Sequence, residues 1–334
     1  MKKTLLVLAV LGTFSASSGA QANVTVYGIV DTGIRHEDNG SAAGSVTRLD
    51  SGILNGSRIG IRGLEDLGGG LSAVFLIENG FNADDGTLGQ GGRLFGRQSW
   101  IGLSGGFGTF KLGRQVTPVF ANSSVFDPFG DTQSGTSSRL FNYSGSRTDN
   151  VLSYGYDSNG LRGELQYGFG EVAGDSSANR MLGAIAGYRT GPIDIVLTYT
   201  SNHNAAGIVR GKTTLIGGNY NFDTVKLFAA YALNKDITPT GIVTGGADTR
   251  DALIGVSVPI GSGVLRASYI RLTDEVRSNA DANQLGVGYV HNLSKRTALH
   301  ASASRLKNDA AASYRAAVPG ASVRTLDIGV RHSF

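Results

Sequence analysis

The chain has no cysteine, only 6 prolines and no long apolar run among its 334 residues. No stretch approaches the ~20 consecutive apolar residues of a membrane-spanning helix, and the mean hydropathy is −0.04 with 17% of residues charged. No proline-rich segment or block of charge divides the chain, which indicates one domain. The net charge of +4 falls to +2 without Lys2 and Lys3, and so small a balance does not indicate nucleic-acid binding.

The first residues predict a secretory signal peptide. Lys2 and Lys3 precede an apolar run over residues 4–14, and Ala20-Gln21-Ala22 has the small residues of a cleavage site. A transmembrane helix is the alternative for this run, but the run is shorter than the ~20 residues that a helix needs to span the membrane. We expect residues 1–22 to be removed and residues 23–334 to form the mature domain. An exported chain without cysteine must draw its stability from backbone pairing and burial, because no disulfide can form.

The chain is rich in glycine, and apolar and polar residues alternate along much of its length. It has 50 glycines without a triplet repeat, which is typical of tight turns and closely packed strands, and its 12 tyrosines and 14 phenylalanines argue against disorder. In residues 161–169, Leu161 and Leu165 share one parity, whereas Arg162 and Glu164 share the other. This period of two predicts strands with one apolar and one polar face. A membrane β-barrel averages such faces to a hydropathy near zero.

Counting these segments predicts about sixteen strands. Short turns such as DLGGG, DSNG and GSG alternate with longer polar connections, as in barrels with short periplasmic turns and long external loops. A soluble β-sandwich is the alternative, but it gives no reason for this regular alternation. The predicted fold is an all-β transmembrane antiparallel barrel, and its strands begin near Val24, Ser57, Leu71, Arg93, Gly108, Asn150, Leu161, Asn179, Ile193, Lys212, Val225, Thr249, Val264, Asp281, Thr297 and Ser322.

Several segments together carry a resemblance that covers most of the chain. They are VTVYGIVDTG at 24–33, SRIGIRGLEDLGGGLSAVFLIE at 57–78, GRQSWIGLSGGFGTFKLGRQ at 96–115, VFDPFGD at 125–131, SRTDNVLSY at 146–154 and a final alternating strand that ends on Phe334. In order and spacing they resemble the trimeric Gram-negative general porins, particularly those of β-proteobacteria and Neisseria. A terminal strand ending in phenylalanine is similar to the assembly signal of outer-membrane barrels.

The resemblance implies a location, partners and an activity. It implies a homotrimer in the outer membrane, in contact with outer-membrane lipids and lipopolysaccharide, that passes small hydrophilic solutes and ions through a water-filled pore. It also implies that the long connection over about residues 117–148, the third loop, folds into the barrel and narrows it. A connection of this length without regular structure is usually functional when it is ordered, and an exposed loop is the alternative.

In the porins that the chain resembles, basic side chains on the wall face carboxylates on the third loop. Arg58 and Arg62 lie opposite in parity to Ile59 and Ile61, so alternation alone turns both arginines into the lumen. The basic positions predicted from parity and resemblance are Arg58, Arg62, Arg97, Arg114 and Arg147, and the acidic loop positions are Asp127 and Asp131.

Two of these assignments carry a difficulty. Arg114 shares the parity of Phe110 and Leu112, so an inward Arg114 needs a β-bulge or a strand that has already ended. In the loop, DPFGD departs from the related enteric pattern PEFGGD, and the number of loop carboxylates is therefore open. Three arginines, Arg58, Arg114 and Arg147, against two aspartates predict a weak preference for anions.

Other chemistry has little support in the sequence. Residues 206–213, AGIVRGKT, resemble a phosphate-binding loop, but an alternating strand follows where that motif needs a helix. No GxSxG or HExxH motif occurs, so we expect no catalytic, metal or cofactor site. The remaining alternatives are a substrate-specific channel, an outer-membrane hydrolase built from distant residues, and a structural barrel with a plugged lumen.

Overall fold

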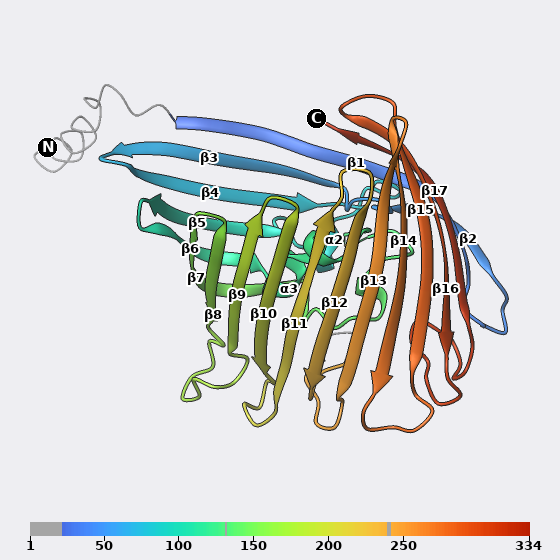
Figure 1. Ribbon diagram of the computed structural model, residues 1–334. Coiled ribbons are helices and arrows are strands. Elements are labelled where there is room, and N and C mark those ends of the chain that lie inside the picture. The colour runs from blue at the N-terminus through green and yellow to red at the C-terminus, as the bar shows by residue number, and fades with distance from the viewer. Residues whose placement is uncertain (1–21, 131, 239–241) are drawn as a thin grey trace, which may run out of the picture.

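In the computed structural model, which describes residues 22–130, 132–238 and 242–334, antiparallel strands form one closed barrel (Figure 1). The predicted signal peptide lies outside the described residues apart from Ala22, which begins the first strand. Among the described residues, no helix is long and apolar enough to cross a membrane.

The strands have the following bounds: β1 Ala22–Asp38, β2 Val46–Ser51, β3 Arg58–Gly68, β4 Leu71–Gly80, β5 Gln98–Gly105, β6 Gly108–Val116, β7 Arg147–Ser158, β8 Leu161–Gly168, β9 Met181–Thr190, β10 Ile193–His203, β11 Arg210–Asn221, β12 Lys226–Lys235, β13 Thr249–Ile260, β14 Gly263–Asp274, β15 Ala282–Asn292, β16 Thr297–Asn308 and β17 Val323–Ser333. The short turn α2 (Gly89–Gly92) follows β4, and the connection after β6 contains the helical turns α3 (Pro118–Ala121), α4 (Ser123–Phe126) and η1 (Ser137–Arg139).

The seventeen strand segments occupy sixteen positions around the barrel. Both β2 and β3 pair with β1, β2 with Thr32–Glu37 and β3 with Ala22–Ile29, so the two segments follow one another in a single position. Each later strand pairs with the next, and β17 returns to pair with β1, with Gly33 opposite Gly329. The predicted barrel of about sixteen strands is confirmed.

The predicted strand starts agree with the structure within three residues at fifteen positions, and the largest of these shifts is Asn150 against Arg147. The exception is the strand predicted from Arg93, which begins at Gln98 because residues 89–92 form the turn α2, where Gln90 and Gly91 have left-handed φ values of 49° and 73°. The separate segment β2 was not predicted.

The alternation places apolar side chains on the outer face of the wall. In β12, Leu227, Tyr231 and Leu233 are exposed on the outside, whereas Phe228 and Ala232 on the other parity are buried inside the barrel. A soluble protein would leave few such residues in contact with water, and an apolar outer band is typical of a barrel that faces lipid.

The barrel closes at a seam where the C-terminal residue meets β1. Phe334 and Gly28 exchange two backbone hydrogen bonds, with N···O distances of 3.1 and 3.2 Å. The Phe334 ring covers Gly28 so closely that a Cβ at position 28 would lie 2.2 Å from its Cζ atom and 2.8 Å from the Arg58 carbonyl oxygen. Glycine at position 28 therefore lets the terminal ring lie against the seam.

Gly28→Val should destabilise the folded barrel by about 1–3 kcal/mol, because the added side chain overpacks the seam. The measurement is the urea midpoint of unfolding for the refolded full chain, with retention of the compact band on unheated gels as a second readout. Gly106→Val is the matched control, since a Cβ there would have no atom within 4 Å. Equal midpoints for the two variants would contradict the role assigned to the Gly28–Phe334 contact.

Candidate pore constriction

The connection between β6 and β7, residues 117–146, runs inside the barrel along its inner wall. It starts beside β9, where the Pro118 ring lies next to Gly183, and it reaches β16, where the Ser134 and Ser302 hydroxyls are 3.0 Å apart. Its aromatic residues Phe126 and Phe141 are buried with Leu215 and other inward residues of the wall. The prediction that the third loop folds into the barrel is therefore confirmed.

Glycines in the wall make room for this loop. A Cβ at Gly217 would lie 2.5 Å from the Phe126 Cβ atom, and one at Gly286 would lie 2.3 Å from the Gly135 Cα atom. Gly255 leaves space in the same way for Pro128, whose Cγ would be 2.7 Å from the added atom. The loop thus packs where the inner wall lacks side chains, which is one reason for the high glycine content.

Asp127 connects two parts of the third loop through hydrogen bonds. Its carboxylate accepts hydrogen bonds from the Ser137 backbone N–H and hydroxyl, both at 2.6 Å, from the Phe129 N–H at 2.8 Å and from the Thr136 hydroxyl at 3.1 Å. Burial raises the pKa of Asp127 to about 6 against the lowering effect of these donors. Asp127 was expected to face the lumen. Because the residue is only 1% exposed, its carboxylate does not do so. The other predicted acid, Asp131, lies outside the described residues.

A second segment, residues 52–57 between β2 and β3, also turns inward. The buried Asp31 carboxylate accepts the backbone N–H groups of Leu54 and Asn55 at 3.2 and 3.1 Å. The Leu54 carbonyl in turn accepts the hydroxyl of Thr132 from the third loop. This inward segment was not predicted from the sequence. The signal that could have indicated it is the apolar pair Ile53-Leu54 between Gly52 and Gly56, which interrupts the strand.

Arg97 and Arg147 meet at the base of the third loop. Arg147 Nε donates to the Arg97 carbonyl oxygen at 2.8 Å, and its guanidinium carbon lies 5.0 Å from the centre of the Phe120 ring. Arg97 Nε lies 2.7 Å from Glu78 Oε1, and the other Glu78 oxygen accepts the Tyr27 hydroxyl at 2.7 Å. Glu78 and Tyr27 were missed, although both have the inward parity of their strands.

Arg58 and Arg62 lie on the same stretch of wall and have inward parity. Ile59 between them is 44% exposed on the outer face. Arg58 is paired in the sheet with Ile29 and with Gly80, and a Cβ on Gly80 would be 3.0 Å from the Arg97 Cδ atom. Arg62 lies over the Tyr27 ring at 5.6 Å, a cation–π contact. Four of the five predicted arginines therefore gather on one side of the barrel.

The fifth, Arg114, is held in a different cluster. The pairing of β6 with β7 moves from Gly113↔Val151 to Gln115↔Thr148, so β7 carries the extra residue of a β-bulge. Arg114 therefore keeps the parity of Leu112, which is exposed on the outer face. Its guanidinium pairs with Asp149, which also pairs with Arg93 at 2.7 Å. This placement differs from the expectation of a pore-lining Arg114, because the bulge lies on the other strand.

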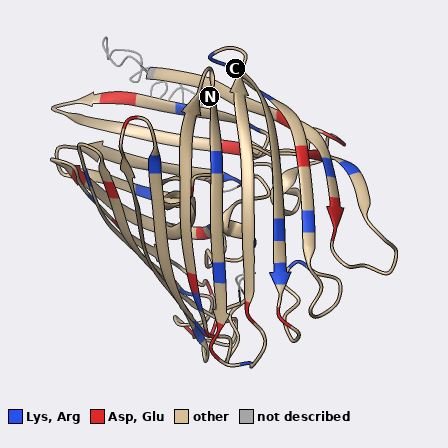
Figure 2. Cartoon of the chain, turned by 45° about the vertical axis from the view of Figure 1, so that its right-hand side comes forward, with Lys and Arg blue, Asp and Glu red and all other residues tan. Residues whose placement is uncertain are grey.

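Two further cations reach the loop and the inward segment from other strands. Arg266 of β14 lies with Nη1 3.5 Å from Gln133 Oε1, and Arg331 of β17 donates to Asn55 Oδ1 at 3.1 Å. Parity alone would have predicted that Arg331 points inward, because the outward residues Leu326, Ile328 and Val330 have the other parity in β17. Figure 2 shows bands of both charge signs spread over many strands, without a single block of one sign.

The described residues contain no group of three or more histidine, cysteine, aspartate or glutamate side chains that could hold a metal ion. The arrangement instead surrounds an aqueous passage with fixed charge. Arginines from several strands lie beside the loop, and the one described carboxylate of the loop, Asp127, is buried and lies within electrostatic reach of Arg266. Such an arrangement can attract anions and orient small polar solutes.

Comparison with known proteins gives consistent matches over the whole chain. A family model described as Gram-negative porin matches residues 6–311. Outer membrane porin protein 32 of Delftia acidovorans and an outer membrane porin protein of Bordetella pertussis are each 34% identical, and each match covers 100% of both chains. In structure, the anion-selective porin from Comamonas acidovorans matches with a TM-score of 0.83 at 31% identity, covering 94% of this chain and 100% of that one. The chain therefore belongs to the Gram-negative porin family and is an integral β-barrel channel of the outer membrane, not an enzyme.

Proposed function

We propose that the barrel passes small hydrophilic solutes and ions by diffusion and weakly prefers anions. The observation that carries the preference is the group Arg58, Arg97 and Arg147 at the base of a loop whose one described carboxylate, Asp127, is buried. The anion-selective porin from Comamonas acidovorans, with which the chain shares 31% identity, supports the same sign of selectivity. Sixteen strands enclose more space than one loop against the wall can fill, so the passage is water-filled.

The preference should be weak. Glu78 lies 2.7 Å from Arg97 and neutralises much of its charge, so the net positive charge of the group is smaller than three arginines alone would give. Two charges 4 Å apart in water interact by only ~1 kcal/mol, and salt screens charge over about 8 Å at physiological ionic strength. Selectivity of about severalfold is therefore expected, and it should fall as salt rises.

The double variant Arg58→Glu, Arg147→Glu should shift the zero-current potential in a salt gradient toward cations, because it reverses two charges beside the loop. The shift should be largest at low salt. Planar-bilayer recordings on the refolded full chain measure it. Lys295→Glu is the control with the same charge change per site, since Lys295 is exposed in the short turn between β15 and β16 and lies away from the loop.

An unchanged zero-current potential in the double variant at low salt would show that these arginines do not set selectivity. The channel proposal itself would be refuted if the unmodified protein gave no conductance in bilayers and no swelling of liposomes in small sugars.

The loop should set the width of the pore. Gly217→Val adds bulk behind Phe126, at a cost of about 1–3 kcal/mol if the loop stays in place, and so should push the loop toward the pore axis. We expect a lower single-channel conductance. Gly155→Val is the control, because it adds the same inward bulk on β7 where the nearest atom is 3.5 Å away and belongs to Glu164, outside the loop. Equal conductance in both variants would argue against a loop that limits flow.

We also propose a homotrimer with bound lipopolysaccharide. The short strand β2 pairs with β1 on one side and with no strand on the other among the described residues, which leaves an edge for a partner to cover. On the outer face, Arg305 and Arg324 flank a groove of about 450 Å³ lined by Leu285, Val287 and Leu326. Arginines above an apolar groove suit a lipid with phosphate groups and acyl chains.

One native mass spectrum of protein extracted from outer membranes tests these partners together with signal cleavage. The expected mass is that of three chains beginning at Asn23, with retained lipid that is lost in Arg305→Gln, Arg324→Gln. A monomer mass would refute the trimer, a chain that still starts at Met1 would refute cleavage, and equal lipid retention in the variant would refute the groove as the lipid site.

A further inference from the structure

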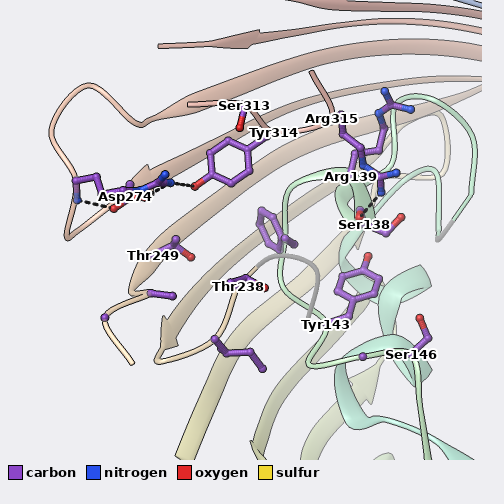
Figure 3. A pocket seen from close by; sticks show the side chains of 16 residues that line it. Ser138, Arg139, Tyr143, Ser146, Thr238, Thr249, Asp274, Ser313, Tyr314 and Arg315 are labelled. Carbon is purple, nitrogen blue, oxygen red and sulfur yellow. Dashed lines mark hydrogen bonds and ion pairs between the residues drawn. The ribbon is translucent and has the colours of Figure 1, made fainter. Parts of the chain in front are cut away.

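A cavity of about 720 Å³ lies beside the second half of the third loop, residues 138–146. Residues of the long connections that follow β12, β14 and β16 also line it. Arg139, Phe141 and Tyr143 of the loop line it, together with Tyr314 and Arg315 from the connection between β16 and β17 (Figure 3). None of the constriction residues Arg58, Arg97 and Arg147 belongs to its lining. The cavity is therefore a separate feature of the barrel interior, and its size is within the ~300–1,000 Å³ typical of small-molecule sites.

One end of the cavity is cationic. Arg139, whose side chain is 8% exposed, lies 3.6 Å from Glu37 and 3.3 Å from the Thr325 hydroxyl, and its Nε atom is buried without a hydrogen-bond partner among the described residues. Arg315 donates to the Ser138 carbonyl oxygen at 3.4 Å and has no ion pair in the described part of the chain. Burial and the nearby Arg315 lower the pKa of Arg139 to about 10. Both guanidiniums therefore lack a full complement of anionic partners.

The surrounding carboxylates are already shared. Glu37 also lies 3.5 Å from Arg48, and the neighbouring Arg35 occupies Asp327 and Asp50 at 2.6 and 3.0 Å. Four arginines, Arg35, Arg48, Arg139 and Arg315, thus face three carboxylates. An anion that entered the cavity would find donors from the buried Arg139 and from the exposed Arg315, and such charge-assisted hydrogen bonds are stronger than neutral ones.

The other end of the cavity is aromatic and electrically neutral. Arg277 there is held by Asp274 through Nε at 2.9 Å and Nη2 at 2.7 Å, so its charge is satisfied within the protein. Tyr314 lies with its hydroxyl 3.4 Å from Arg277, and burial raises its pKa to about 12. In Figure 3 the Tyr314 ring lies across the cavity from Arg139 and Tyr143. A ligand bound here would have the Tyr314 ring at one end, and Arg139, Arg315 and the Tyr143 ring at the other.

We propose that this cavity binds small aromatic carboxylates, with the carboxylate on Arg139 and Arg315 and the ring between Tyr314 and the loop residue Tyr143. A planar carboxylate matches the donor geometry of guanidinium groups, and an aromatic ring gains from offset or edge contacts with the two tyrosine rings. The site would hold such solutes above the constriction before they pass it. Binding requires the folded barrel but not ion selectivity.

Isothermal titration of benzoate into the detergent-solubilised full-length protein tests the proposal. Benzoate should bind saturably, whereas acetate, which lacks the ring, and benzyl alcohol, which lacks the charge, should bind at least about tenfold more weakly, the effect of losing one such group. Arg315→Gln should weaken benzoate binding about tenfold through the loss of a charged donor. Arg139→Gln, which tests the buried partner, should do the same.

Arg271→Gln is the matched control, since Arg271 is exposed, pairs with Asp281 at 3.2 Å and does not line the cavity. Unchanged conductance without benzoate shows that a variant is folded and separates this test from the channel proposal. The inference is overturned if benzoate does not bind saturably, if its affinity is the same in the chain, in R315Q and in R139Q, or if acetate or inorganic phosphate binds as tightly as benzoate.

Discussion

Everything in this barrel depends on the pairing of every strand edge. In a lipid environment, an unpaired backbone N–H or C=O has no water to replace its partner, so an open sheet is not a stable alternative. The chain satisfies this constraint when β17 returns to β1, and the Phe334–Gly28 contact completes the seam. The one described edge outside the pattern belongs to β2, and it lies where the second strand position is interrupted so that residues 52–57 can turn inward.

Closure of the barrel determines the wall. The shape of the interior then depends on the third loop and on residues 52–57, which pack against the inner face of the wall. The third loop is held by its own burial against glycines of the wall and by Asp127, which gathers four donors from the loop. The inward segment contributes through Asp31, which binds two backbone N–H groups of that segment. In both places an aspartate acts as an internal brace for irregular backbone, the use that buried carboxylates with several N–H donors allow.

Period-two patterns were sufficient to predict most of the fold, because in a membrane barrel every strand must present one face to lipid and one to water. The same parity predicted Arg58 and Arg62 as inward residues and would have predicted Glu78 and Arg331. It failed where the backbone stops alternating. The extra residue between β6 and β7 could lie on either strand, so the orientation of Arg114 was not determined by its own sequence. The burial of Asp127 depends on residues up to ten positions away that fold back on it.

The use of acidic residues also explains the electrical character of the passage. A carboxylate that is held by the backbone is less able to counter an arginine of the passage, and Asp127 and Asp31 near the third loop are held in this way, whereas Glu78 does counter Arg97. Asp127 and Asp31 hold backbone, Glu78 holds Arg97 and Tyr27, and Asp327 holds Arg35. Each guanidinium has five donors and no acceptor, so an arginine can bind a backbone carbonyl, as Arg147 does with that of Arg97, and keep donors for other partners. A barrel with nearly balanced total charge can therefore support the proposed weak preference for anions, because part of its acidic charge holds backbone instead of facing the arginines.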